Sequence, residues 1–228
     1  SNSYQVSLTS TGGISTATAL AIVESANPDS LPTALRPIGV TPLTELGNGT
    51  YKGETGGLYG NGRNEPPPQQ QEAAKRAAAR IQPLDAQGQP SASGTIGLVG
   101  VGMSNTTQEF SAFKKLADAD RQKSDKVAIV DVAQGGQAAA QWTDPASDTG
   151  KRVWGTVDQR LKAAGVAREQ VQVVWIKQAL ITQAQFGEFP AHARTLERDL
   201  ATTLRLLKQR FPNLQLAYMS RRIYAGYA

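Results

Sequence analysis

Cysteine is absent from the 228 residues of this chain, and histidine occurs once. The lack of cysteine excludes disulfide bonds and thiolate metal sites. No run of about 18 apolar residues occurs, so no segment has the composition of a transmembrane helix. A signal peptide is absent as well, but the opening Ser1-Asn2-Ser3 resembles a processed or engineered start. This absence therefore says little about where the natural protein is located.

The single histidine, His192, lies in the segment 189–193, where the pattern predicts the start of a helix. An exposed first-turn residue or a local contact is favoured there over a general base. Asp131 and Asp144 lie near each other in the sequence, but two unpaired carboxylates are poor evidence for a metal site. We therefore expect no metal and no cofactor.

The net charge is modest: 24 Lys and Arg face 19 Asp and Glu, a formal charge of +5. The basic residues are spread over expected helices, as in Lys75-Arg76, Lys114-Lys115 and residues 205–210. This distribution is typical of solvated helix faces. Nucleic-acid binding needs basic residues clustered with aromatic ones, so we expect no nucleic-acid partner.

The most informative segment covers residues 96–116. An apolar run that begins at Ile96 ends in Gly102-Met103-Ser104-Asn105, and a helix-like stretch follows. This predicts a strand, a tight turn and a helix start, with the Ser104 hydroxyl at the turn. Free backbone N–H groups at a helix start can stabilise an oxyanion beside a nucleophilic serine. Serine is also a favoured N-cap residue, so Ser104 has a purely structural interpretation too.

Strands and helices alternate from Ile96 onward. Apolar strand-like segments follow at 127–132, 171–178 and 214–220, and helical patterns cover 108–119, 153–164 and 189–210. This alternation predicts an α/β fold, a doubly wound parallel sheet with helices on both faces. Ligands bind such sheets at the carboxyl ends of the strands. Ser104, Gly135-Gly136 and Lys177-Gln178 each follow an expected strand end, so we expect them to meet in one crevice.

The first 94 residues have a different character. Residues 1–25 contain two segments of period-two alternation around Gly12-Gly13, which predicts a β-hairpin similar to the end of an immunoglobulin-like module. Residues 26–94 have the composition of a connector, with one alanine-rich helix expected over 69–80. We therefore divide the chain into a hairpin (1–25), a connector (26–94) and an α/β domain (95–228).

The segment Gly102-Met103-Ser104-Asn105 lacks the second glycine of the Gly-x-Ser-x-Gly elbow of α/β-hydrolases. It resembles instead the first sequence block of the SGNH (GDSL-like) hydrolases, in their sialate O-acetylesterase-like branch. The later strand ends follow in the order of that family, and the segments 43–47 and 56–59 also fit it. The resemblance covers roughly residues 40–228.

The resemblance implies a three-layer, flavodoxin-like SGNH fold and a serine esterase that removes acyl groups from sugars. Ser104 would be the catalytic nucleophile. The oxyanion would be held by the backbone N–H groups of Ser104 and Gly136, with the Gln178 amide in place of the commoner asparagine. The match fits Gly135 as well as Gly136, and an ordinary tight turn also explains this pair. Substrate contacts are expected from Asn105, Gly135, Gln137 and Lys177.

Two tryptophans lie near the same strand ends. Trp142 and Trp175 could form a wall that stacks on a sugar ring. Tryptophans at strand ends more often pack in the core, and we favour that interpretation.

The general base of the family is absent from the sequence. SGNH hydrolases carry an Asp-x-x-His after the last strand, and no such motif occurs here. His192 precedes the last expected strand. We therefore expect the α/β domain to be incomplete at its C-terminus, with the catalytic His and Asp beyond Ala228. The substrate class and the hairpin favour a secreted or periplasmic location.

Two other functions fit the same sequence. A non-catalytic carbohydrate-binding domain would keep the crevice, the glycines and the tryptophans without a base. A flavodoxin-like nucleotide binder would place a phosphate at the Ser104 helix start, but the expected Gly-x-Gly-x-x-Gly or Walker loop is missing. The sequence identifies neither the sugar, nor the acyl group, nor the oligomeric state.

Overall fold

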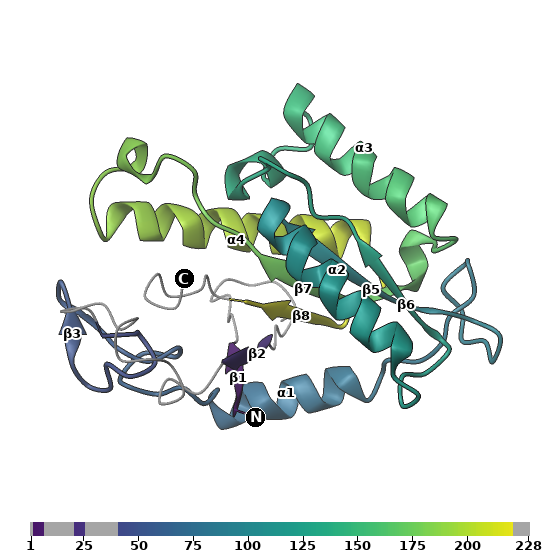
Figure 1. The fold of residues 1–228 in the computed structure, drawn as a ribbon, viewed down its shortest axis with the longest axis horizontal. Helices are drawn as coiled ribbons and strands as arrows, with labels where there is room; N and C mark the ends of the chain where they lie inside the picture. The colour runs from purple at the N-terminus through teal and green to yellow at the C-terminus, as the bar shows by residue number, and fades with distance from the viewer. Residues whose placement is uncertain (1, 7–20, 26–40, 221–228) are drawn as a thin grey trace.

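The computed structural model describes residues 2–6, 21–25 and 41–220. Its centre is a four-stranded sheet made of β5 (Ile96–Gly102), β6 (Val127–Asp131), β7 (Val171–Lys177) and β8 (Leu216–Met219). Neighbouring strands are parallel, in the order β6-β5-β7-β8. The structure is therefore α/β with a parallel sheet, compatible with a flavodoxin-like fold, as the alternation in the sequence predicts (Figure 1).

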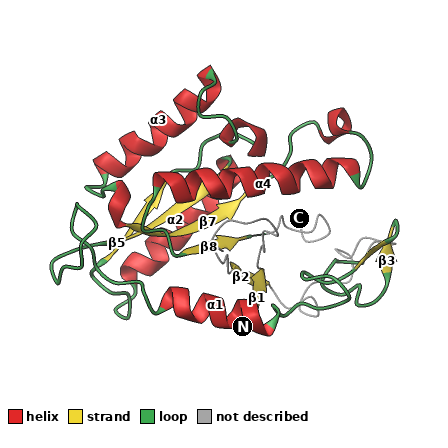
Figure 2. Cartoon of the chain, turned by 180° about the vertical axis from the view of Figure 1, so that it is seen from behind, coloured by secondary structure: helices red, strands yellow, loops and turns green. Residues whose placement is uncertain are grey.

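Helices flank this sheet. The long helices of the described residues are α1 (Pro68–Ala78), α2 (Ser104–Ala119), α3 (Asp148–Ala163) and α4 (Ala191–Arg210). Short 3-10 turns are η3 (Ala139–Trp142), η4 (Arg168–Gln170) and η5 (Gln183–Phe186). Figures 1 and 2 show α3 and α4 on one side of the sheet and α1 on the other.

The larger part of the core lies between the sheet and helices α3 and α4. Val99 and Val101 of β5 are fully buried there, in one cluster with Val153 and Val157 of α3 and Leu207 of α4. Valine packs well on a pleated surface, and a parallel sheet covered by helices favours such apolar runs. The apolar character of β5 is thus explained by its place inside the sheet.

The opposite face of β5 carries glycine, which lets α2 approach closely. A Cβ at Gly100 would lie 2.7 Å from the ring of Phe110 on α2. The Phe110 ring in turn stacks on Trp175 of β7, with the ring centroids 5.7 Å apart. These contacts hold the first turns of α2 directly over the sheet.

The helices start at other residues than periodicity predicts. α2 begins at Ser104 rather than residue 108, and α3 begins at Asp148 rather than residue 153. The expected boundaries were wrong because the first turn of a helix is often polar and carries no apolar period. The start of α3 is instead defined by a cap, since the Ser147 Oγ accepts a hydrogen bond from the Gly150 N–H at 3.0 Å.

The segments before β5 are described only in part. β1 (Asn2–Val6) and β2 (Ala21–Ser25) pair antiparallel, while the turn expected at Gly12-Gly13 lies outside the described residues. Within the expected connector, β3 (Thr50–Tyr51) and β4 (Glu54–Thr55) form a short antiparallel pair. The alanine-rich helix is α1, which covers nearly the predicted range.

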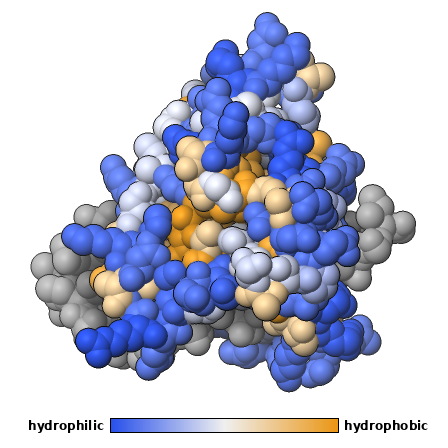
Figure 3. Space-filling model, turned by 90° about the vertical axis from the view of Figure 1, so that its right-hand side faces the viewer, coloured by the Kyte–Doolittle hydropathy of each residue, from blue (hydrophilic) through white to orange (hydrophobic). Residues whose placement is uncertain are grey.

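The outer surface is polar over most of the side seen in Figure 3, with apolar residues gathered near its middle. This arrangement suits helices that turn one apolar face toward the sheet. Among the residues that the structure describes, no helix combines the length and the apolar character needed to cross a membrane.

Candidate functional site

The predicted site residues lie at one edge of the sheet. β5 ends at Gly102, β6 at Asp131 and β7 at Lys177, and these strands are parallel neighbours. Hydrogen bonds join the loops that follow them: the Gln134 N–H donates to the Gly102 carbonyl at 2.9 Å, and the Ala139 N–H donates to the Ala179 carbonyl at 3.1 Å. The carboxyl edge of the sheet therefore brings three separate loops together, as expected for this fold class.

Ser104 is the first residue of α2, and its side chain is exposed. The N-cap position belongs to Met103, whose backbone is extended (φ −98°, ψ −170°). The Ser104 hydroxyl forms no hydrogen bond within the part of the chain that the structure describes. The capping interpretation of Ser104 is therefore wrong: Met103 occupies the cap position, and no described residue is bonded to the Ser104 hydroxyl.

Hydrogen bonds of the Thr106 hydroxyl stabilise the turn before α2. Its hydroxyl donates to the Lys177 carbonyl at 2.9 Å and accepts from the Met103 N–H at 3.3 Å, and the side chain is fully buried. Gly102 leaves the room for this contact, because a Cβ there would lie 2.2 Å from the Thr106 Oγ1. The turn that presents Ser104 is thus fixed to the end of β7 by a residue that the sequence did not single out.

The paired glycines after β6 form a turn beside Ser104. The Gln137 N–H donates to the Gln134 carbonyl at 3.2 Å, and Gly136 has the left-handed backbone that favours glycine (φ +74°). A Cβ built on Gly135 would lie 3.8 Å from the Ser104 Cβ. Gly136 therefore serves the shape of the turn, while Gly135 is the member of the pair that faces Ser104.

Gln178 connects the loop after β7 with this glycine turn. Its side chain is only 5% exposed, and its Nε2 donates to the Gln137 carbonyl at 3.3 Å. The same carbonyl accepts from the Trp142 indole N–H at 3.1 Å. The Oε1 of Gln178 is buried and has no hydrogen-bond partner among the described residues. The side chain thus fixes the position of the glycine turn, and one of its amide hydrogens has no partner there.

Lys177 and Asn105, both predicted to contact substrate, lie in different surroundings. The Lys177 side chain is 5% exposed, and its ammonium pairs with the Glu109 carboxylate on the next turn of α2. Asn105 is the second residue of α2 and is half-buried. The Lys177–Glu109 pair connects α2 with the end of β7, and the Glu109 carboxylate neutralises the charge of the buried Lys177 ammonium.

The two tryptophans are packing residues. Trp142 is fully buried and meets Trp154 edge to face, with the ring centroids 5.4 Å apart. Trp175 lies under Phe110, as described above. Trp142 agrees with the core interpretation, whereas Trp175 is half-buried and is covered on one side by Phe110.

His192 and the two aspartates have local partners. The His192 Nδ1 lies 3.2 Å from the Gly187 carbonyl, and its ring contacts Phe189. The Asp131 Oδ1 accepts from the Ala133 N–H at 2.9 Å, and the Asp144 Oδ1 accepts from the Ala146 N–H, also at 2.9 Å. No group of three potential metal ligands occurs among the residues that the structure describes. A base beside Ser104 is likewise not found in this part of the chain.

Sequence reasoning missed Thr106 and Glu109. Their spacing offers a weak signal, since the third and sixth residues of a helix that follows a strand can turn back toward that sheet. What identifies them is the partner, Lys177, which lies far away in the sequence.

A scan of family models and searches of curated proteins and solved structures find no match to this chain.

Proposed function

We propose that the chain is the catalytic part of a serine esterase of the SGNH type, which removes acyl groups from sugars through an acyl-enzyme on Ser104. One observation carries the proposal: an exposed serine hydroxyl, with no hydrogen bond to any described residue, stands at the N-terminus of α2, at the carboxyl edge of a parallel sheet. A serine that is not needed as a cap is free for chemistry. The substrate class and a secreted or periplasmic location rest on the family resemblance.

The oxyanion would be stabilised by groups already held in place. The first N–H groups of α2 have no partner inside the helix and lie at the positive end of its dipole. The Ser104 N–H is one of them, and the N–H groups of Gly135 and Gly136 come from the neighbouring turn. The second amide hydrogen of Gln178, which has no partner among the described residues, would add a side-chain donor to these backbone groups. Donors that need no rearrangement are the main source of transition-state stabilisation in acyl transfer.

In the proposed reaction, the Ser104 Oγ attacks the ester carbonyl carbon and loses its proton to a base. The sugar hydroxyl leaves with a proton, and water then releases the acyl group as a carboxylic acid. His192 is not assigned as the base, because its ring is engaged with Gly187 and Phe189. A histidine of an Asp-x-x-His motif, which these 228 residues do not contain, would accept the proton.

The proposal can be tested on the chain as it stands by supplying the base from solution. The protein is incubated with 4-nitrophenyl acetate and increasing imidazole, and the peptide that contains Ser104 is examined by mass spectrometry. An acetyl group on Ser104, formed faster as imidazole increases, is the expected result. Ser147→Ala is the matched control, because Ser147 also stands at a helix start but is engaged as a cap.

Acetylation spread equally over exposed serines and lysines, or unchanged in Ser104→Ala, would contradict the proposal. The alternative of a non-catalytic carbohydrate-binding domain has one observation in its favour: no described residue accepts a hydrogen bond from Ser104. That alternative predicts saturable binding of an oligosaccharide without any acetyl-serine.

A further inference from the structure

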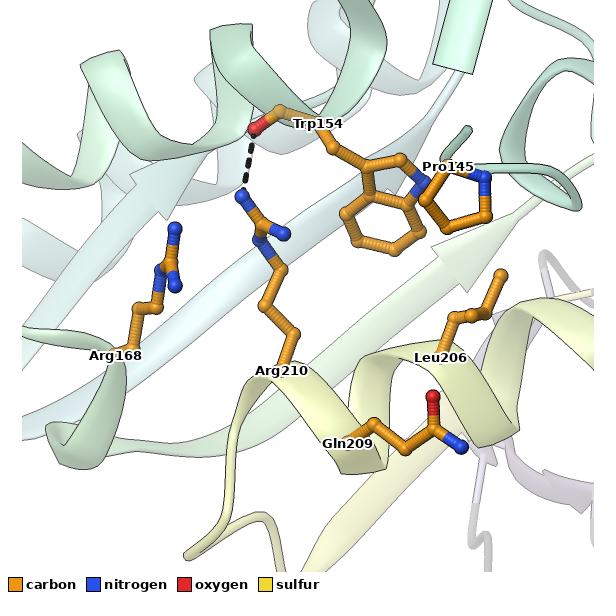
Figure 4. A pocket seen from close by; sticks show the side chains of 6 residues that line it. All are labelled: Pro145, Trp154, Arg168, Leu206, Gln209 and Arg210. Atoms are coloured by element: carbon orange, nitrogen blue, oxygen red, sulfur yellow. Dashed lines mark hydrogen bonds between the residues drawn. The ribbon is translucent and has the colours of Figure 1, made fainter. Parts of the chain in front are cut away.

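A concave site lies between α3 and α4, away from Ser104. It is a cavity of about 290 Å³. Its lining residues come from the segment before α3, from α3, from η4 and from the end of α4, and Figure 4 shows them from close by: Pro145, Trp154, Arg168, Leu206, Gln209 and Arg210. Arg168 comes just before β7 and Arg210 comes before β8, so these two arginines lie toward the amino ends of the strands. The cavity is therefore distinct from the Ser104 edge.

The two arginines share a single carboxylate. Arg168 donates to Asp158 through Nε at 2.9 Å and through Nη2 at 2.7 Å, and the Arg210 Nη2 pairs with the same Asp158. A second carboxylate, that of Glu169, also acts on Arg168, so both guanidinium groups have acidic neighbours. Asp158 raises the pKa of Arg168, and burial lowers the pKa of Arg210. Arginine remains charged at neutral pH in either case.

Two buried hydrogen-bond donors in the lining of the cavity lack acceptors among the described residues. Trp154 is 3% exposed, and its indole N–H has no hydrogen-bond partner among the described residues. The Arg210 Nε is buried and is unpaired in the same sense. The guanidinium lies over the Trp154 ring, 5.3 Å from the centroid, and donates through Nη2 to the Trp154 carbonyl. Buried donors without acceptors are rare in folded proteins because each one costs free energy.

We propose that this cavity binds a small organic carboxylate. Buried donors without acceptors call for an acceptor group, and a planar carboxylate fits the fork of donors on a guanidinium. The Arg210 Nη1 and the Gln209 amide are the donors that face the ligand. Leu206 and Pro145 supply an apolar wall for the remainder of the molecule. The volume lies at the lower limit of small-molecule sites, which favours a ligand the size of a single ring.

The test uses benzoate as the probe and benzamide, its neutral counterpart of the same shape, as the control ligand. The chain has three tryptophans, so the indole N–H signals in a ¹H–¹⁵N spectrum are few, and that of Trp154 can be assigned with Trp154→Phe. Benzoate at constant ionic strength is expected to shift the Trp154 signal saturably. Arg210→Gln is expected to weaken binding by roughly tenfold to a hundredfold, the usual effect of losing a charge-assisted hydrogen bond.

Arg198→Gln is the matched protein control, because Arg198 is an exposed arginine of the same helix whose guanidinium donates to the Thr195 hydroxyl and does not line the cavity. Gln209→Ala provides a second lining variant if Arg210→Gln does not fold, and it too should weaken benzoate binding. The proposal is overturned if benzoate produces no saturable shift, if benzamide or sulfate binds equally well, or if the lining variants bind as the parent does. Ser104→Ala should leave benzoate binding unchanged, so this result is independent of the proposed esterase.

Discussion

Helices α2 and α3 begin in similar ways and use their first serine differently. Each follows a strand of the same sheet, and each has a serine at its start, Ser104 in α2 and Ser147 before α3. Ser147 is a working N-cap: its Oγ accepts from the Gly150 N–H at 3.0 Å and donates to the Asp144 carbonyl at 2.8 Å. Ser104 is instead the first residue inside its helix, after the cap position, and its hydroxyl is not bonded to any residue that the structure describes.

The difference lies in what secures each helix start. At α3 the serine does so itself. The start of α2 is stabilised by other residues. Thr106 is buried and donates a hydrogen bond to the Lys177 carbonyl, and the Lys177 ammonium pairs with Glu109. A serine that does not stabilise the start of its helix is available for another role, such as nucleophilic attack. The comparison therefore separates a structural serine from a candidate nucleophile, and four substitutions test it.

The largest effect is expected for Ser104→Ala on acyl transfer. Loss of the serine from a complete triad costs about six orders of magnitude in kcat. With imidazole as the base, we expect the variant to retain only the background hydrolysis of 4-nitrophenyl acetate, while Ser147→Ala keeps the rate of the parent. Initial rates and the acetylated peptide give the readout. Equal losses in both variants would remove the functional distinction between the two serines.

Gly102→Ala should be the most destabilising of the conservative changes. The new methyl group would lie 2.3 Å from the Lys177 carbonyl oxygen, a backbone atom that cannot turn aside. We expect a loss of about 1–3 kcal/mol in the free energy of unfolding, measured with urea. Gly155→Ala in α3 is the control: no atom lies within 4 Å of the added Cβ, and helix propensity predicts a gain of about 0.5–1 kcal/mol.

Glu109→Gln should destabilise the protein more than Asp148→Asn. Glu109 is the counterion of Lys177, whose side chain is 5% exposed, whereas the Lys151 partner of Asp148 is 66% exposed. Removing the partner of a buried charge costs about 1–3 kcal/mol, while an exposed pair contributes little. Urea denaturation of both variants at one ionic strength checks this. Equal stabilities would show that the Lys177 pair does not secure α2.

The smallest effect concerns the stability role of the two serines. Ser147→Ala removes a cap and should cost about 1 kcal/mol. Ser104→Ala removes a hydroxyl that is not bonded within the described part of the chain, so its free energy of unfolding should stay within about 0.5 kcal/mol of the parent. Thermal and urea unfolding measure both. A larger loss for Ser104→Ala would reveal a structural role that its geometry does not provide.

Much of the fold could be predicted because it depends on local pattern. Apolar runs such as 127–132 and 171–178 have the length of buried strands, and the helical patterns between them require parallel crossovers. The helix boundaries could not be read in this way. The first turns of α2 and α3 are polar, and the residues that define them, Thr106 and Ser147, act through single hydrogen bonds.

The candidate site was predictable only as a neighbourhood. Ser104, Gly135-Gly136 and Lys177-Gln178 were expected at strand ends, and parallel strands place them at one edge. The roles expected of Gly136, Gln178, Lys177, Gln137 and Asn105 stay predictions. What each side chain contacts depends on partners from other segments, which no local pattern encodes.

The sequence alone determined the chemistry that is available: no thiol, one histidine, and a serine at the junction of a glycine-rich strand and a helix. These follow from residue identity and from order along the chain. Tertiary structure decided which groups are free to react. It placed Met103 at the cap, turned Gly135 toward Ser104, buried the Lys177 ammonium against Glu109 and gathered two arginines around Asp158. The reason is physical: a hydrogen bond or an ion pair joins groups that are close in space, and only packing brings distant parts of the chain together.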